Sequence, residues 1–271
     1  MLSAFKDSVN VRLRLLWINT VNTWQAETAY FGDTWGNVLS TVMYTLTYLI
    51  FIEVIFTNTK ILAGYTRNEM LFLLFIIQIN FYLIFTWSYN NVVKMVDDVN
   101  LGTFDLILIK PLPALYYTSI RNITLISTLR DAVPSLLIIA LVINWSQIHV
   151  APIAVVAGIS IIICGQIAMN TFFFLLGLPV FWFGQAADLL GLSYSFMSNN
   201  LPFEGLGKPL KLALTSLIPC LLASSFAASV MLGRTDTAKG IIYALFIAIG
   251  ALIIKTFVWR LALRNYTSAS S

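Results

Sequence analysis

Long apolar blocks alternate with polar connections along most of this 271-residue chain. A helix of about 20 apolar residues is long enough to cross the roughly 30 Å hydrocarbon core of a bilayer. Strands of a membrane barrel would alternate polar and apolar residues over about 10 positions, and these blocks do not alternate. The sequence therefore predicts an all-α membrane protein with about six transmembrane helices, in a single transmembrane domain over residues 1–271. The predicted spans are residues 38–56, 70–89, 131–148, 152–176, 180–197 and 240–259.

The first 24 residues show a different pattern. Apolar residues such as Phe5, Val9 and Leu13 recur at helical spacing, and basic residues such as Lys6 and Arg14 fall on the other faces. A helix of this kind lies in the plane of the membrane interface with its apolar face down. We therefore expect an N-terminal interfacial amphipathic helix over residues 1–24.

A second apolar block, within residues 209–232, admits two interpretations. Residues 212–232 carry no charge and are long enough to cross, but a seventh span would place the two chain ends on opposite sides. Basic residues near both ends indicate that both termini are cytoplasmic, because cytoplasmic segments are enriched in Lys and Arg. Pro219 also removes a backbone hydrogen bond in the middle of the block. We therefore predict two short re-entrant helices on the outer side before the last span, with a seventh span as the alternative.

Composition supports the membrane assignment and excludes several chemistries. Hydrophobic residues make up 59% of the chain and charged residues only 10%, against about 25% charged in a typical soluble domain. The single His149 and the two cysteines, Cys164 and Cys220, have no spacing that suggests a metal site or a disulfide framework. The net charge of +4 comes from residues that flank the apolar blocks, so no nucleic-acid partner is expected.

The cytoplasmic connection between the second and third predicted spans carries the most specific pattern. Gly102 is followed by the acidic Asp105, an aliphatic run, and then Lys110 and Pro111. This segment resembles the membrane subunits of type-2 ATP-binding-cassette (ABC) exporters, and more narrowly a bacterial group of paired permeases encoded beside an ATPase. The stretch from residue 201 to residue 234 resembles the same group, in which it forms short outer helices before the last span.

The resemblance implies a mechanism and a set of partners. Residues 97–110 would form the coupling helix, which docks on a separate ATPase subunit; an ordinary solvated loop is the alternative. The expected docking residues are Asp97, Asp98, Gly102, Asp105, Lys110 and Pro111. The implied partners are two ATPase subunits, a second permease of the same or a related kind, and membrane lipid, in a bacterial inner membrane. ATP and Mg would be bound by the ATPase, with no cofactor on this chain.

Nucleotide chemistry is not predicted for this chain itself. A phosphate-binding Walker loop requires Gly-x-x-x-x-Gly-Lys-Ser/Thr, and the nearest fragment, residues 205–208, is followed by Pro209. The chain is therefore predicted to be a permease subunit and not an enzyme, with no catalytic residues.

Two acidic residues lie within predicted spans, where an ionisable group costs roughly 2.5–3.5 kcal/mol at the bilayer centre. Glu53 and Asp188 are therefore candidates for a substrate path, together with the aromatic residues Trp87 and Tyr89. Alternatively, Glu53 is interfacial and the aromatics belong to the anchoring belt. The scarcity of charge within the spans favours a hydrophobic or amphiphilic substrate. A proton-coupled secondary transporter that uses Glu53 and Asp188 is the alternative function.

Overall fold

A computed structural model describes residues 17–18, 21–22, 25, 31–184, 186, 189–191 and 202–266. These residues form helices and loops, and no strand occurs among them. Most of the predicted interfacial helix at 1–24 and half of the predicted span at 180–197 lie outside the described residues, so both stay predictions. The all-α fold class is confirmed.

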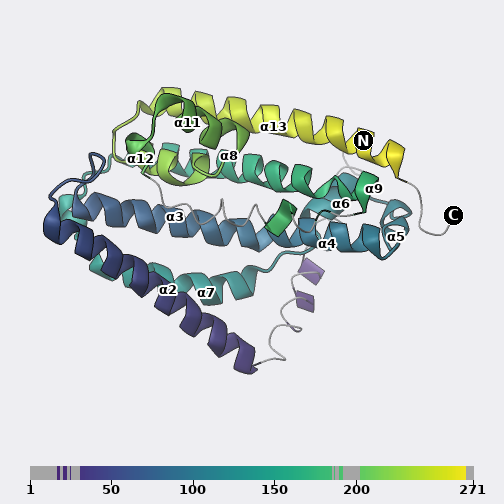
Figure 1. Ribbon diagram of the computed structural model, residues 1–271, viewed down its shortest axis with the longest axis horizontal. Coiled ribbons are helices and arrows are strands. Elements are labelled where there is room, and N and C mark those ends of the chain that lie inside the picture. Colours follow the sequence, from purple (N-terminus) through teal and green to yellow (C-terminus); the bar gives the residue numbers. More distant parts are fainter. Residues whose placement is uncertain are drawn as a thin grey trace, which may run out of the picture.

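Five long helices form the body of the protein (Figure 1). They are α2 (Phe31–Asn58), α3 (Arg67–Trp87), α7 (Leu125–Val142), α8 (Pro152–Gly177) and α13 (Thr237–Asn265). In Figure 1, α13 lies along α8, α8 lies along α3, and α2 and α7 form the opposite side of the bundle. Among the described residues, five helical segments are long and apolar enough to cross a membrane, or six if a bent pair counts as one span. This agrees with the prediction of about six.

Two observed helix ends differ from the predicted ones, because local backbone geometry determines where each helix stops. The third long helix ends at Val142, not at residue 148, because Ile143 is extended and residues Trp145–Gln147 form the 3₁₀ turn η1. The predicted break at Gly177 and Pro179 is also displaced. The short helix α9 (Val180–Phe183) follows α8 directly, and the chain leaves the helix at Gly184, whose φ is +67°. Pro179 is tolerated because it stands at the start of α9, where no N–H is needed.

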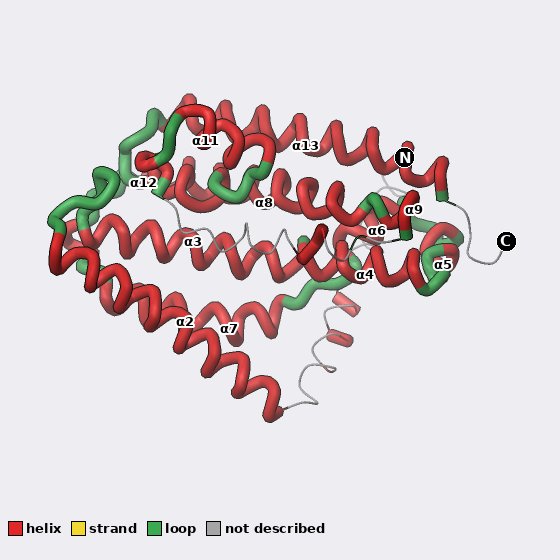
Figure 2. Tube along the Cα trace, viewed as in Figure 1, coloured by secondary structure: helices red, strands yellow, loops and turns green. Residues whose placement is uncertain are grey.

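The connection between α3 and α7 is folded (Figure 2, right). It contains α4 (Tyr89–Asn100), α5 (Asp105–Leu108) and α6 (Ala114–Ile120). Residues 97–110, predicted as one coupling helix, are instead the last turn of α4, a reversal, and the single turn of α5. Gly102 causes the division because its φ of +69° is a left-handed conformation that ends a helix and that glycine adopts without strain.

The block at 209–232 forms two short helical segments joined at a sharp bend. α11 (Lys208–Leu212) runs into the π-helical turn η3 (Ala213–Leu217), and the π-helical turn η4 (Leu222–Phe226) runs into α12 (Ala227–Met231). The two halves are bent by 103°. Ser229, near the end of the pair, donates a 2.6 Å hydrogen bond to Glu204, in the 3₁₀ turn η2 (Phe203–Gly205) just before its start. Both ends of the pair therefore lie together, a path consistent with the predicted re-entrant helices.

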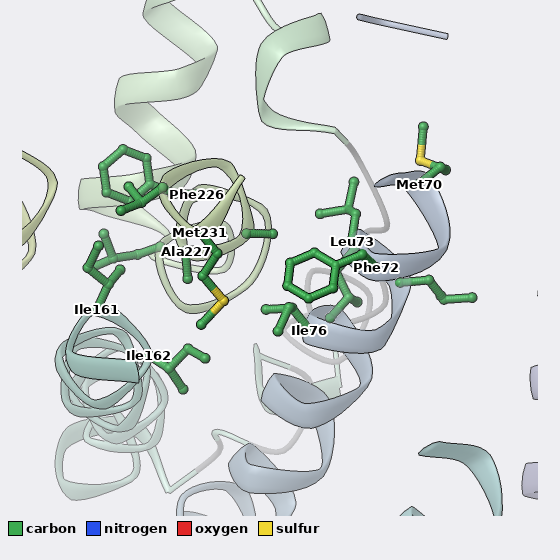
Figure 3. Packing of buried hydrophobic residues seen from close by; sticks show 14 of the residues in the cluster. Met70, Phe72, Leu73, Ile76, Ile161, Ile162, Phe226, Ala227 and Met231 are labelled. Atoms are coloured by element: carbon green, nitrogen blue, oxygen red, sulfur yellow. The ribbon is translucent and has the colours of Figure 1, made fainter. Parts of the chain in front are cut away.

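Two hydrophobic clusters hold the bundle together. The first joins α3 to α8, η4, α12 and α13; Figure 3 shows Phe72 and Ile76 of α3 with Ile161 and Met231. Its close packing depends on Gly165 of α8, where a Cβ would stand 2.7 Å from a backbone atom of η4. The second cluster joins α4, α5, α9 and the last turns of α13 at the other end of the molecule.

Candidate functional site

A compact tip projects at the end of the bundle that carries α5 (Figure 1). We define the α5 tip as residues 97–113. Four large aliphatic side chains lie on its surface: Leu101 is 76% exposed, Leu106 is 60% exposed, Leu108 is 41% exposed and Ile109 is 79% exposed. Exposed apolar side chains that cluster outside the spanning helices are typical of a protein–protein contact surface.

Phe104 anchors the α5 tip to the spanning helices. This side chain is fully buried. Its ring centroid lies 5.2 Å from those of Phe181 in α9 and Tyr266, and 6.1 Å from that of Trp259 in α13. The Tyr266 hydroxyl has a raised pKa because it is partly desolvated and because the negative charge of Asp105 acts on it. The tip is thus packed against the ends of two helical segments of the bundle.

The predicted docking residues have different environments in the tip. Asp97, Lys110 and Pro111 are exposed, and Lys110 donates a 2.7 Å hydrogen bond to the Tyr117 hydroxyl. Asp98 instead forms an ion pair with Arg121, and both side chains are largely buried.

The position of Asp98 differs from the prediction made from the sequence, in which Asp97, Asp98 and Asp105 all contact the ATPase. Because Arg121 lies in the return path from α6, it neutralises Asp98 within the chain. Asp105 is half-buried in the tip, whereas Asp97 is exposed, so Asp97 is the acid that the tip presents outward.

A groove runs along α2 on the side that faces α3 and α7. It consists of three adjoining cavities, with volumes of about 450, 370 and 290 Å³ in order from the α5 end. The first two share Thr41, Phe81 and Tyr82, and the second and third share Tyr48. We call this feature the α2 groove. The first two cavities form the polar part of the groove, which is also lined by Asn37, Ser40, Tyr44, Gln78, Asn90, Thr124, Thr128, Arg130 and Asp131. The third cavity forms the apolar part, whose lining includes Ile52, Ile55, Leu73 and Leu74.

Polar contacts shape the walls of the α2 groove. Thr45 and Ser135, both fully buried, are 2.7 Å apart and fasten α2 to α7. Tyr82 interacts with both Ser135 and Thr41. Arg130 donates hydrogen bonds of 2.7 and 3.0 Å to the Asp131 carboxylate, so these two charges compensate each other.

The structure does not bring the predicted substrate-path residues together. Glu53 pairs with Arg67 at the end of the bundle opposite the α5 tip, and both side chains are more than a third exposed. Trp87 donates to Gln166 of α8 at 3.4 Å. The ring of Tyr89 packs on Phe173, 6.0 Å between centroids. None of these three predicted residues lines the α2 groove, and Asp188 lies outside the described residues.

Sequence analysis overlooked Lys255, a buried cation in α13. Its ammonium donates hydrogen bonds to Asn170 of α8 at 2.7 Å and to Ser119 of α6 at 2.9 Å, and it lies 4.4 Å from the centroid of the Phe174 ring. Lys255 therefore links the connection that carries the α5 tip to two spanning helices. The available signal was a lysine inside the apolar block at 240–259, four residues before its end.

Among the described residues, no group of three or more His, Cys, Asp or Glu side chains could hold a metal ion. The long apolar helices define a multi-pass α-helical membrane protein. A family model described as ABC-2 family transporter protein matches residues 42–270. The chain therefore belongs to this family and is an ABC transporter permease, as the resemblance implied. No curated protein and no solved structure matches the chain significantly.

Proposed function

We propose that this permease is the membrane subunit of an exporter, and that a separate ATPase subunit drives it by docking on the α5 tip. The observation that carries the proposal is the exposed aliphatic surface of Leu101, Leu106 and Ile109 on a rigidly anchored tip. Family membership supports an ABC transport system around this chain. The substrate is hydrophobic or amphiphilic, and ATP and Mg are bound by the ATPase.

Anchoring of the tip supports a mechanical role. Phe104 packs on α9 and on the end of α13, and Lys255 links α6 to α8 and α13. Packed elements move as bodies and do not deform continuously, so a displacement of the tip reaches the spanning helices. An ATPase that moves the tip during hydrolysis would in this way shift helices of the permease.

The α5 tip lies in the cytoplasm in this proposal. Arg260 and Arg264 end α13 near the tip, and Lys6, Arg12 and Arg14 precede α2, which begins at the same end. Lys and Arg are enriched on the cytoplasmic side. Basic residues also occur at the opposite end, but Arg67 and Arg234 there are paired with Glu53 and Glu69. Both termini are then cytoplasmic, in a bacterial inner membrane.

The working assembly in this proposal contains two permeases and two ATPase subunits, with the second permease the same or a related chain. The apolar outer faces of α2 and α13, with exposed residues such as Ile50, Ile253 and Phe257, are available to lipid or to the second permease. The hydrolytic chemistry belongs to the ATPase.

The experiment is to co-purify the ATPase with permease variants and to measure stimulated ATP hydrolysis. Ile109→Asp places a charge in the apolar contact. We expect at least a tenfold loss of ATPase association, because burying an isoleucine contributes about 1.5–3 kcal/mol and each 1.4 kcal/mol is a factor of ten. Ile61→Asp is the matched control, since Ile61 is 62% exposed in the loop at the opposite end. Equal association of both variants with the ATPase would refute docking on the tip.

A further inference from the structure

The side of α2 that faces the groove is polar, although α2 crosses the apolar part of the bundle. Asn37, Thr41, Tyr44 and Tyr48 follow one another at helical spacing and all line the α2 groove. Residues elsewhere on the helix, such as Met43, are apolar and exposed. Polar side chains within a span are costly and usually face an interior or a polar ligand.

Gln78 on α3 gives the strongest indication that the groove is a binding site. The residue is only 3% exposed, and its side chain lines the central cavity. No hydrogen bond of its amide occurs within the described part of the chain, yet its polar atoms are not among the fully enclosed unpaired ones there. The amide is therefore open to the cavity, where a ligand with its own hydrogen-bonding groups can bond to it.

The charge state of the groove limits the class of ligand. Arg130 and Asp131 are the charged residues that line it, and they neutralise each other through two hydrogen bonds. The other polar groups there are hydroxyls and amides, each able to donate and accept. A charged head group would therefore meet no uncompensated opposite charge, whereas an uncharged polar head group would find both donors and acceptors.

Polarity changes along the groove. The cavity farthest from the α5 tip is lined almost entirely by aliphatic and aromatic side chains, among them Ile52, Ile55, Leu73 and Leu74. From Asn37 to Ile55 the groove follows α2 for about 27 Å, at 1.5 Å per residue, close to the roughly 30 Å hydrocarbon core. A molecule with a polar head and an apolar tail matches this change in polarity.

We propose that the α2 groove binds the transported substrate, and that this substrate is an amphiphile with an uncharged head group bearing hydroxyls or amides. The head group bonds to Gln78 and to the hydroxyls of Thr41 and Tyr44, and the tail lies against Ile52 and Leu73. This inference deepens the proposed function and rests on it, because it identifies the substrate of the same permease.

The test uses full-length permease in lipid nanodiscs and three probes with the same alkyl chain. Tritiated dodecyl glucoside, dodecyl phosphate and dodecyltrimethylammonium are titrated below their critical micelle concentrations, with empty nanodiscs as the partition blank. We expect saturable binding of the glucoside and at least tenfold weaker binding of both charged probes. Gln78→Leu and Thr41→Val should each weaken glucoside binding, Gln78→Leu by at least tenfold.

Two features keep the test interpretable. Replacing Gln78 by leucine removes no hydrogen bond within the described chain, so the variant should fold. Thr47→Val is the matched control for Thr41→Val, since the Thr47 hydroxyl is exposed on the same helix and bonds back to the Met43 carbonyl at 2.8 Å; it should leave binding unchanged.

Several outcomes would overturn the inference. These are unaltered glucoside binding in Gln78→Leu, equal binding of the charged probes, or disulfide cross-linking of Ser40→Cys between two permeases, which would make the groove an interface. The failure of this inference is separable from failure of the proposed function, because docking is read independently from ATPase association with Ile109→Asp.

Discussion

The ion pair between Asp98 and Arg121 offers the sharpest distinction between a sequence-based and a structure-based interpretation. The sequence pattern assigns Asp98 to the ATPase interface. In the structure the Asp98 and Arg121 side chains are only 19% and 10% exposed and form an ion pair. Because the ion pair stabilises the fold, neutralising Asp98 should lower the stability of the isolated permease, in the absence of any ATPase.

The expected magnitude follows from the burial of the pair. Removing one partner of a buried ion pair costs about 3–5 kcal/mol because the other charge is left uncompensated. The Nε atom of Arg121 already has no hydrogen-bond partner among the described residues, so its guanidinium depends strongly on Asp98. Residual solvent contact lowers the figure, and we expect Asp98→Asn to cost about 3 kcal/mol in the free energy of unfolding.

The assay is equilibrium unfolding of the purified permease in mixed micelles, as a double-mutant cycle. Asp98→Asn, Arg121→Met and the double variant should show a coupling free energy of at least about 1 kcal/mol, in the range found for contacting charged residues. Asp97→Asn is the control, because Asp97 is exposed one position earlier, and it should stay within about 0.5 kcal/mol of the parent.

One result would refute this reasoning. If Asp98→Asn leaves the isolated permease as stable as the parent but abolishes ATPase association, Asp98 is a docking residue and the ion pair contributes nothing. A coupling free energy near zero would also show that the ion pair contributes nothing to stability.

Three further predictions follow from the packing and the ion pairs. Gly165→Ala should destabilise the permease by about 1–3 kcal/mol through overpacking, whereas Gly36→Ala, with nothing within 4 Å of the new Cβ, should stabilise it by up to about 1 kcal/mol in micelle unfolding. Lys255→Met should raise hydrogen exchange of the α6 amides, because it removes the bond to Ser119; unchanged exchange would contradict the link. Glu53→Gln should leave ATP-driven transport intact, because an exposed ion pair contributes only about 0–1 kcal/mol. The proton-coupled alternative would be favoured by two results together: loss of transport in this variant, and loss of transport by the parent when the proton gradient is collapsed.

The α5 tip shows how a sequence motif can be located correctly and still be misread in detail. The glycine, the acids and the proline stop identify the segment, but the φ of Gly102 divides it into α4 and α5. The apolar residues that face outward, Leu101, Leu106 and Ile109, were not expected to matter. In a short segment, helix or turn depends on one dihedral angle, and which side chains are exposed depends on what Phe104 packs against.

The sequence by itself determined the class of protein and most of the spans, because transfer into a bilayer is a nearly additive property of local composition. A run of apolar residues crosses the membrane whatever its neighbours are. The short motif between two spans was enough to indicate the family, which the match over residues 42–270 confirms.

Only the tertiary structure decided which polar groups meet. Thr45 and Ser135 are 90 positions apart, Lys255 and Ser119 are 136 apart, and the α2 groove takes its walls from three helices. Such contacts depend on the rotation of each helix about its axis and on which faces pack together. That rotation is set by the packing of whole surfaces, which no local window of the sequence contains.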